Sequence, residues 1–253
     1  MFRSAAFALL SIAFISTASW SVEPSNPIVI VHGAWGGSHH WKSVEQEIES
    51  ETSHPVTRVS LTGLGPKQHL LSRDIKLETH IKDVMNVIEF EGLDNVIIIG
   101  HSYGGAVVRG VVDRLPQLID QVFYLDSHLL NDGESFFSHH PERKLEAEKL
   151  AAQKGEGYFL PVTWPNETIR DTPHPLATLL DPIKLQDDGA SSVKGQFWLF
   201  ADGKPAEHDS RFMYLTRAKQ QGLEARVFAW GHNPHRKRPT ELAAELIKTI
   251  SAK

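Results

Sequence analysis

Short apolar runs alternate with amphipathic segments along most of this 253-residue chain. A run of consecutive β-branched or aromatic residues is typical of a strand that is buried on both faces of a parallel sheet, where no polar alternation is needed. Six such runs predict strands, at residues 28–31, 56–61, 96–99, 122–125, 197–200 and 225–229.

Between these runs, apolar positions recur at the spacing of a helix. Within 79–88, one face collects Ile81, Val84, Met85 and Ile88, and the charged residues fall on the other face. Further helices are predicted directly after the strand at 96–99, near 211–220 and at 240–250. Strands that alternate with helices predict an α/β fold with a doubly wound, mostly parallel sheet, which binds ligands beyond the carboxyl ends of its strands.

This alternation stops between about residue 127 and residue 188, where Pro, Gly and paired histidines interrupt the pattern. We therefore expect a single domain over 22–253, with a small irregular cap, about 127–188, inserted after the strand that ends at Asp126. Six bulky residues of this stretch would supply apolar surface over a pocket: Phe136, Phe137, Tyr158, Phe159, Leu160 and Trp164.

The first 21 residues have the pattern of a secretory signal peptide. Arg3 supplies a positive start, 5–15 is apolar but too short to span a bilayer, and small residues near 16–21 suit cleavage. This predicts a periplasmic or secreted protein with no membrane contact after cleavage. An uncleaved anchor or tail stays open as the alternative, because a chain without cysteine carries no sign of its redox compartment.

Composition narrows the classes of partner. The formal net charge of −5 gives no electrostatic basis for binding nucleic acid. The basic cluster at 236–238 is typical of a solvated loop, and His232 with His235 lacks the third ligand of a metal site. We expect a small-molecule substrate, no metal and no cofactor, and the oligomeric state stays open.

The most informative segment is 100–104, with the sequence Gly-His-Ser-Tyr-Gly, between the predicted strand at 96–99 and the apolar residues 106–108. A strand, a sharp turn and a helix with serine at the apex are the pattern of a nucleophile elbow. The strained turn lifts the serine Oγ out of the sheet, and flanking glycines let strand and helix approach closely. We therefore predict that Ser102 is a nucleophile.

Two further polar residues also follow predicted strands. Asp126 comes directly after 122–125, and His232 follows the last strand. Ser, Asp and His in this chain order can form a triad, in which the imidazole takes the serine proton and the carboxylate orients the imidazole. Asp202 is the alternative acid. We favour Asp126, because Asp202 precedes a glycine as a turn residue does, whereas Asp126 ends the strand beside that of Ser102.

A serine nucleophile that attacks a carbonyl also needs hydrogen-bond donors for the oxygen that becomes negative. Two backbone amides are candidates for this oxyanion hole. Tyr103 begins the helix after the elbow, where the helix dipole favours an anion, and Ala34 lies in the turn after the strand at 28–31.

Four motifs together resemble the bacterial α/β-hydrolases related to pyrethroid hydrolases, plant methyl esterases and hydroxynitrile lyases; they occupy 31–35, 61–65, 100–105 and 124–126. The likeness covers nearly the whole chain after the leader, and it implies the α/β-hydrolase fold. In the plant members the acid follows the strand equivalent to 197–200, at a position that falls near Lys204, which cannot serve. This departure favours Asp126. The plant lyases carry a lysine just after the base, where this chain has Asn233, and this disfavours cyanohydrin cleavage.

These patterns predict a serine hydrolase that cleaves carboxylic esters of small, hydrophobic substrates through an acyl-enzyme intermediate. Two alternatives stay open. One is a hydroxynitrile lyase-like enzyme or a C–C bond hydrolase that uses the same residues, and the other is a non-catalytic small-molecule binding protein on the same fold. The natural substrate, and the choice between esters, thioesters and lactones, also stay open.

Overall fold

A computed structural model describes residues 25–166, 168–186, 193–203 and 205–252, so the predicted signal peptide lies outside the described residues. Six strands form one parallel sheet in the order β2-β1-β3-β4-β7-β8. Their bounds are β1 (Ile28–Val31), β2 (Val56–Val59), β3 (Val96–His101), β4 (Ile119–Leu125), β7 (Lys194–Phe200) and β8 (Glu224–Phe228). The predicted parallel sheet is confirmed, and all six predicted strands are present.

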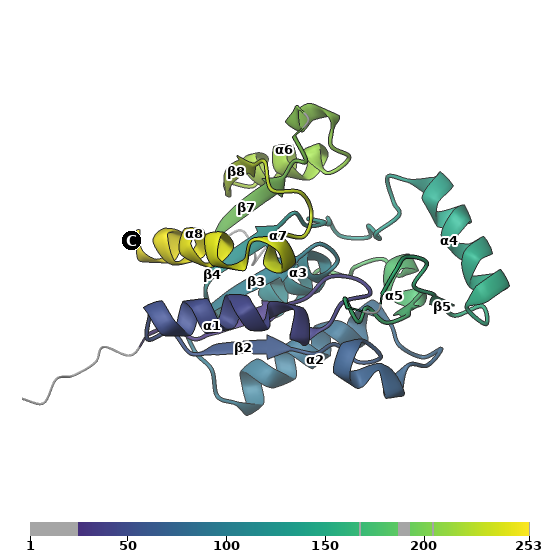
Figure 1. Cartoon of the computed structure of the whole chain (residues 1–253), viewed down its shortest axis with the longest axis horizontal. Helices are drawn as coiled ribbons and strands as arrows, with labels where there is room; N and C mark the ends of the chain where they lie inside the picture. The colour runs from purple at the N-terminus through teal and green to yellow at the C-terminus, as the bar shows by residue number, and fades with distance from the viewer. Residues whose placement is uncertain (1–24, 167, 187–192, 204, 253) are drawn as a thin grey trace, which may run out of the picture.

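Helices cover both faces of this sheet (Figure 1). On one face lie α1 (Lys42–Glu51) and α8 (Pro239–Ser251), and on the other α2 (Leu77–Phe90), α3 (Gly104–Arg114) and α6 (Phe212–Gln220). The short α7 (Pro234–Lys237) precedes α8. Within the described ranges, no helix combines the length and the apolar character needed to cross a bilayer.

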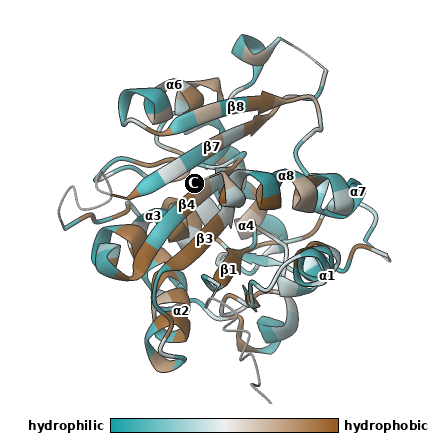
Figure 2. Cartoon of the chain, turned by 90° about the vertical axis from the view of Figure 1, so that its left-hand side faces the viewer, coloured by the Kyte–Doolittle hydropathy of each residue, from teal (hydrophilic) through white to brown (hydrophobic). Residues whose placement is uncertain are grey.

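The two helical layers explain why the central strands are apolar throughout. In β3, Ile97 and Ile99 pack into the core under α1 and α8, whereas Ile98 packs into the core under α2 and α3. All three side chains are fully buried. Figure 2 shows the hydrophobic residues concentrated in β1, β3 and β4 at the centre, with hydrophilic residues on the outer sides of the helices. Burial of such surface contributes about 25 cal/mol per Å², which makes this sheet a rigid platform for the loops at its edge.

The strand order reverses between β1 and β3, and this point fixes where the loops meet. Val31 at the end of β1 pairs with Gly100 of β3, which in turn pairs with Tyr124 of β4. The residues that follow these three strands therefore leave the sheet side by side at its carboxyl edge. Open α/β sheets bind ligands at such a reversal.

The stretch between β4 and β7 is more regular than predicted. It contains α4 (Pro141–Lys154), a two-stranded antiparallel pair, β5 (Phe159–Leu160) with β6 (His174–Pro175), and the short α5 (Ala177–Leu180). The prediction of an irregular stretch was therefore wrong. Helix α4 buries only Ala147 and Ala151, so it has no stripe of large apolar residues from which its period could be read. The unpredicted α1 likewise buries only Val44 and Ile48.

Candidate active site

Ser102 lies directly after β3 in a strained turn. Its φ angle of 54° is in the left-handed region, which costs free energy for a residue with a side chain. The following glycines allow this turn. A Cβ atom on Gly104 would come within 2.6 Å of the carbonyl oxygens of Val31 and His32, and one on Gly105 within 2.3 Å of the Ser127 Cβ. The strand–turn–helix geometry predicted for 100–104 is present.

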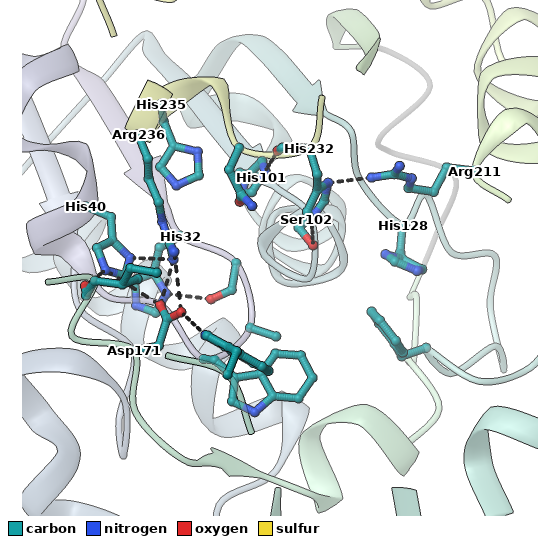
Figure 3. A pocket seen from close by; sticks show the side chains of 18 of the residues that line it. His32, His40, His101, Ser102, His128, Asp171, Arg211, His232, His235 and Arg236 are labelled. Atoms are coloured by element: carbon teal, nitrogen blue, oxygen red, sulfur yellow. Dashed lines mark hydrogen bonds and ion pairs between the residues drawn. The ribbon is translucent and has the colours of Figure 1, made fainter. Parts of the chain in front are cut away.

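The imidazole of His232 lies between Ser102 and Asp126. Its Nε2 is 3.0 Å from Ser102 Oγ, and its Nδ1 is 2.5 Å from Asp126 Oδ2; Figure 3 shows the Ser102 contact. A neutral imidazole with its proton on Nδ1 satisfies both contacts, since Nδ1–H donates to the carboxylate and Nε2 accepts from the serine hydroxyl. The structure thus brings the three predicted residues into one chain of hydrogen bonds.

The Asp126 carboxylate is fully buried at the tip of β4. The residue has a φ angle of 50°, and its amide donates to the Trp198 carbonyl at 2.7 Å. Oδ1 accepts from the amide of Phe200 at 3.0 Å, while Oδ2 contacts both His232 and Arg211. An unpaired buried carboxylate would be very costly, so these donors are what allows a charge at this position.

Asp202, the alternative acid, does not reach the imidazole. Its side chain is exposed and forms no hydrogen bond with His232 in the part of the chain that the structure describes. Asp202 lies instead against the backbone of Gly231, where an added Cβ would be 3.2 Å from Asp202 Oδ1. Lys204, near which the resemblance places the acid of the plant proteins, falls outside the described residues.

The turn after β1 lies against Ser102. A Cβ atom added to Gly33 would be 3.1 Å from the Ser102 Cβ. The amides of Ala34, in this turn, and of Tyr103 donate no backbone hydrogen bond within the described residues. Two unused N–H donors therefore lie on the chain segments that border the serine.

The side chain of His32 stabilises the same turn through two hydrogen bonds. Its Nδ1–H donates to the Gly33 carbonyl at 2.9 Å, and its Nε2 accepts from the Leu61 amide at 3.3 Å. Burial lowers the pKa of His32 to about 3. The ring is therefore neutral at ordinary pH, as these two hydrogen bonds require.

A cavity of about 610 Å³ opens beside Ser102. Of the six bulky residues predicted to cover it, Phe136 and Trp164 line it, while Phe137 and Leu160 are buried in the core. Seven histidines and three arginines also contribute to the lining. The cavity therefore combines aromatic walls with many polar groups.

Comparison with known proteins agrees with the fold. The model of the Alpha/beta hydrolase family matches residues 28–245. The chain belongs to the alpha/beta hydrolase family. It is 33% identical over 239 residues to a carbendazim hydrolyzing esterase of Nocardioides sp. (strain SG-4G), a match that covers 86% of this chain and 97% of that protein.

Three further similar proteins share less sequence identity with this chain. A putative chloroplastic methylesterase 14 of Arabidopsis thaliana is 30% identical over 48% of this chain and 35% of its own length. An extracellular alpha/beta-hydrolase from a Paenibacillus species superposes with a TM-score of 0.74 at 18% identity, over 88% of this chain and 98% of that one. A pyrethroid hydrolase from Sphingobium faniae JZ-2 superposes with a TM-score of 0.67 at 19% identity, over 90% and 98%. At these identities the two structures support the fold alone.

Sequence reasoning did not find Arg211 in this alpha/beta hydrolase. Its guanidinium donates two hydrogen bonds to the Asp209 carboxylate, from Nε to Oδ1 at 2.9 Å and from Nη2 to Oδ2 at 2.8 Å. Its Nη1 contacts both Asp126 Oδ2 and His232 Nδ1. Burial by itself lowers the pKa of Arg211, but the hydrogen bond to Asp209 and the charge of Asp126 outweigh burial and raise the pKa. Arg211 is therefore a permanent cation beside the buried carboxylate. No local motif indicates Arg211, because Asp126 and His232 are distant in the sequence and Asp209 is only a neighbour in the same loop.

The cluster at 236–238 was predicted to be solvated, which is wrong for Arg236. Its Nη2 donates to Asp171 Oδ1 at 2.7 Å, and Trp164 Nε1 donates to Asp171 Oδ2 at 2.9 Å. His40 lies on the same side of the cavity as this pair (Figure 3). The ion pair ties the helix that follows His232 to the segment between β4 and β7. Its partners are 65 residues apart, so no sequence spacing indicates it.

The side chain of Tyr103 is held by a buried histidine. The Tyr103 hydroxyl donates to His80 Nδ1 at 2.8 Å, and His80 Nε2–H donates to the Thr62 carbonyl at 2.8 Å. Burial lowers the pKa of His80 from 6.5 to about 4, although the charge of Asp83 acts in the opposite direction. Protonation at Nδ1 would reverse the hydrogen bond with Tyr103, because the imidazolium N–H then donates to the hydroxyl oxygen.

We predict that His80 makes the fold sensitive to acid. Because its pKa is lower in the folded state, the unfolded chain binds more protons below pH 6.5, and stability falls as the pH drops from 6.5 toward 4. The expected loss between pH 7.5 and pH 5 is about 2 kcal/mol from this residue. His80→Gln should lose correspondingly less than the wild type in urea unfolding at the two pH values. An equal loss in both proteins would contradict the assignment.

Proposed function

We propose that this chain is a carboxylic-ester hydrolase in which Ser102 is the nucleophile, His232 the base and Asp126 the orienting acid. The observation that carries the proposal is the unbroken contact from Ser102 Oγ through the imidazole to the buried carboxylate, at the point where the strand order reverses. The named activity of the Nocardioides esterase, which aligns over almost its whole length, supports the same reaction class.

Acylation follows from this geometry. Ser102 Oγ attacks the ester carbonyl carbon while its proton passes to His232 Nε2, and the carbonyl oxygen becomes negative. Asp126 stabilises the imidazolium that forms. The amides of Ala34 and Tyr103 donate to the oxyanion, and each such donor contributes about 3 kcal/mol to the transition state.

Acylation ends when the tetrahedral intermediate collapses: the bond to the alcohol oxygen breaks, and this oxygen receives the proton from His232 Nε2 and leaves. Deacylation then uses the same groups, as water attacks the carbonyl carbon of the acyl-enzyme with His232 as base. The carboxylic acid departs and Ser102 regains its proton, so that no cofactor is consumed.

The cavity supports small substrates with apolar parts. Its volume of about 610 Å³ lies within the range of small-molecule sites. Trp35 and Trp164 meet edge to face with ring centroids 5.5 Å apart, and Phe136 also borders the cavity. These rings offer contact to a hydrophobic acyl or alcohol group, and we propose the segment between β4 and β7 as a cap that keeps water from it.

We expect a fluorophosphonate to label Ser102, and Ser102→Ala to abolish both labelling and hydrolysis of p-nitrophenyl esters. Peptide mapping by mass spectrometry identifies the labelled residue. Cyanohydrins and diketones assayed beside the esters test the lyase and the C–C hydrolase. Label on another residue, or saturable ligand binding without turnover of any of these compounds, would contradict the proposal.

A matched pair of variants tests whether Asp126 or Asp202 is the acid of the triad. Asp126→Asn should lower kcat for p-nitrophenyl acetate by about 10⁴-fold, because the amide no longer favours the productive imidazole tautomer. Asp202→Asn should retain kcat within about threefold, since surface substitutions away from the chemistry have small effects. The reverse result would assign the acid to Asp202.

We propose a periplasmic or secreted location on the pattern of the first 21 residues. Expression in a bacterial host, followed by cell fractionation and N-terminal sequencing, should give a mature chain that begins near residue 22 and lies outside the cytosol. A chain that still begins at Met1 in the cytosol would contradict the prediction.

A further inference from the structure

The turn that carries Ala34 contains a strained tryptophan. The Gly36 amide donates to the Gly33 carbonyl at 3.3 Å, so residues 33–36 form a β-turn with Trp35 as its third residue. The φ angle of Trp35 is 57°. A positive φ at this position of a turn favours glycine, and a bulky residue keeps such a conformation only where its surroundings hold it. Contacts with the rest of the chain must therefore hold Trp35 in place.

All three hydrogen-bonding groups of Trp35 bond to one segment, the segment between β4 and β7. The amide of Trp35 donates to Nδ1 of His174 at 3.3 Å, and its indole Nε1–H donates to the Leu160 carbonyl at 3.2 Å. The carbonyl of Trp35 accepts from the Thr172 amide at 2.7 Å. Leu160 and His174 pair with each other in the β5–β6 sheet, so two of these contacts come from one small sheet. This segment therefore holds the turn that lies against Ser102.

The hydrogen bonds of His174 fix its tautomer. The ring is fully buried, and burial lowers its pKa well below the ordinary value of 6.5, so the imidazole is neutral. The Thr178 hydroxyl donates to the Pro175 carbonyl at 2.8 Å and therefore accepts from His174 Nε2–H, also at 2.8 Å. With its proton on Nε2, the imidazole has a lone pair on Nδ1. His174 is thus the acceptor for the Trp35 amide.

His174 also packs against the second segment of the proposed oxyanion hole. Its ring lies at 80° to that of Tyr103, with the ring centroids 5.0 Å apart. Its ring centroid is 5.5 Å from that of Trp35. Tyr103 carries one of the two proposed donor amides, and Trp35 directly follows Ala34, which carries the other. One buried imidazole therefore contacts both segments that border the nucleophile.

We propose that His174 is a positioning residue that sets the oxyanion hole by holding the amide of Trp35. Without an acceptor at Nδ1, the peptide between Ala34 and Trp35 can flip, because the flip releases the strained φ angle of Trp35. The turn then no longer directs the Ala34 amide toward the oxygen that becomes negative. This assignment rests on the proposed function, and it makes the segment between β4 and β7 a contributor to transition-state stabilisation.

Two ketones of similar shape test the assignment. Trifluoroacetophenone forms a hemiketal: a bond forms between Ser102 Oγ and its carbonyl carbon, the serine proton passes to His232, and the carbonyl oxygen becomes an oxyanion. Acetophenone binds without forming this bond. We would measure the inhibition constants of both ketones, and kcat and KM for phenyl acetate. The ratio of the two inhibition constants reports how strongly the site stabilises an oxyanion, and titration with a fluorophosphonate gives the fraction of active sites.

We expect His174→Leu to lower kcat about thirtyfold, less than the about 10²- to 10³-fold loss caused by removal of an oxyanion donor. KM and the affinity for acetophenone should stay within about twofold, because an oxyanion hole acts on the tetrahedral state and not on the ground state. The affinity for trifluoroacetophenone should fall by the same factor as kcat. His174→Asn should recover most of this loss, since its side-chain oxygen can accept from the Trp35 amide. An equal loss of affinity for both ketones would overturn the assignment.

Variants of Thr178 test the same hydrogen bond with His174 in place. Thr178→Val removes the acceptor of Nε2–H, so the proton can move to Nδ1, which then cannot accept from Trp35. The preference for trifluoroacetophenone should fall about fivefold, as expected for a weakened neutral hydrogen bond. Thr178→Ser keeps the hydroxyl and should keep the wild-type preference. If His174→Leu does not fold, this pair of variants decides the assignment, and an unchanged preference in Thr178→Val overturns it.

Arg73→Gln is a control for loosening the same segment away from the site. The Arg73 guanidinium lies 4.6 Å from the ring centroid of Tyr158, and neither residue lines the cavity. The preference for trifluoroacetophenone should stay at the wild-type value in this variant. A fall equal to that of His174→Leu would show that any loosening of the segment has the same effect, and it would overturn the specific role of His174.

The ketones separate this proposal from the proposed function, because the hemiketal forms without turnover. If phenyl acetate is hydrolysed but the preference is unchanged in the His174 and Thr178 variants, the role of His174 is overturned and ester hydrolysis stands. If no ester is hydrolysed, the proposed function fails, and the ketone affinities still decide the role of His174. Absence of a hemiketal in the wild type, seen by ¹⁹F NMR, overturns the oxyanion hole and the role of His174 together.

Discussion

The buried carboxylate of Asp126 is the constraint on which the arrangement of this site depends. A charge without solvent must be surrounded by donors, and here they come from three separate segments: the amide of Phe200 in β7, the imidazole of His232 after β8, and Arg211 before α6. The same hydrogen bonds that make the charge tolerable therefore draw these segments to the end of β4. The position of the imidazole over Ser102 follows from this pairing.

Strain and rigidity are combined at the same edge of the sheet. Ser102 and Asp126 end neighbouring strands, and both have a positive φ angle that their side chains disfavour. Their backbones are held by hydrogen bonds to the next strand, from Ser102 to the Leu125 carbonyl and from Asp126 to Trp198. The apolar core on both faces supplies the stability that keeps these conformations in place.

The segment between β4 and β7 gives the cavity its particular chemistry. It contributes Phe136 and Trp164 as aromatic surface, and Asp171 as the partner that anchors Arg236. The ion pair between Arg236 and Asp171 therefore borders the cavity together with these aromatic rings. One fold can serve many functions, so the chemistry of a site depends on the particular residues that surround it.

Much of the architecture could be read from local pattern. The apolar runs gave the strands, since burial on both faces leaves a signal within a few adjacent residues, and the glycines around Ser102 indicated the strained turn. The approach of His232 and Asp126 to Ser102 was predicted from their places at strand ends. Helix α4 was missed, because its buried face consists of two alanines.

Other features were decided by the tertiary structure alone. Arg211 reaches a carboxylate 85 residues away, and Arg236 reaches one 65 residues away. Trp35 bonds to His174, 139 residues away, and this contact exists only once the segment between β4 and β7 packs against the turn after β1. Backbone conformation and hydrophobic periodicity depend on neighbouring residues, whereas ion pairs and burial depend on how distant segments of the chain pack together. This is why the sequence by itself determined the sheet and the candidate nucleophile, and the folded chain decided what surrounds them.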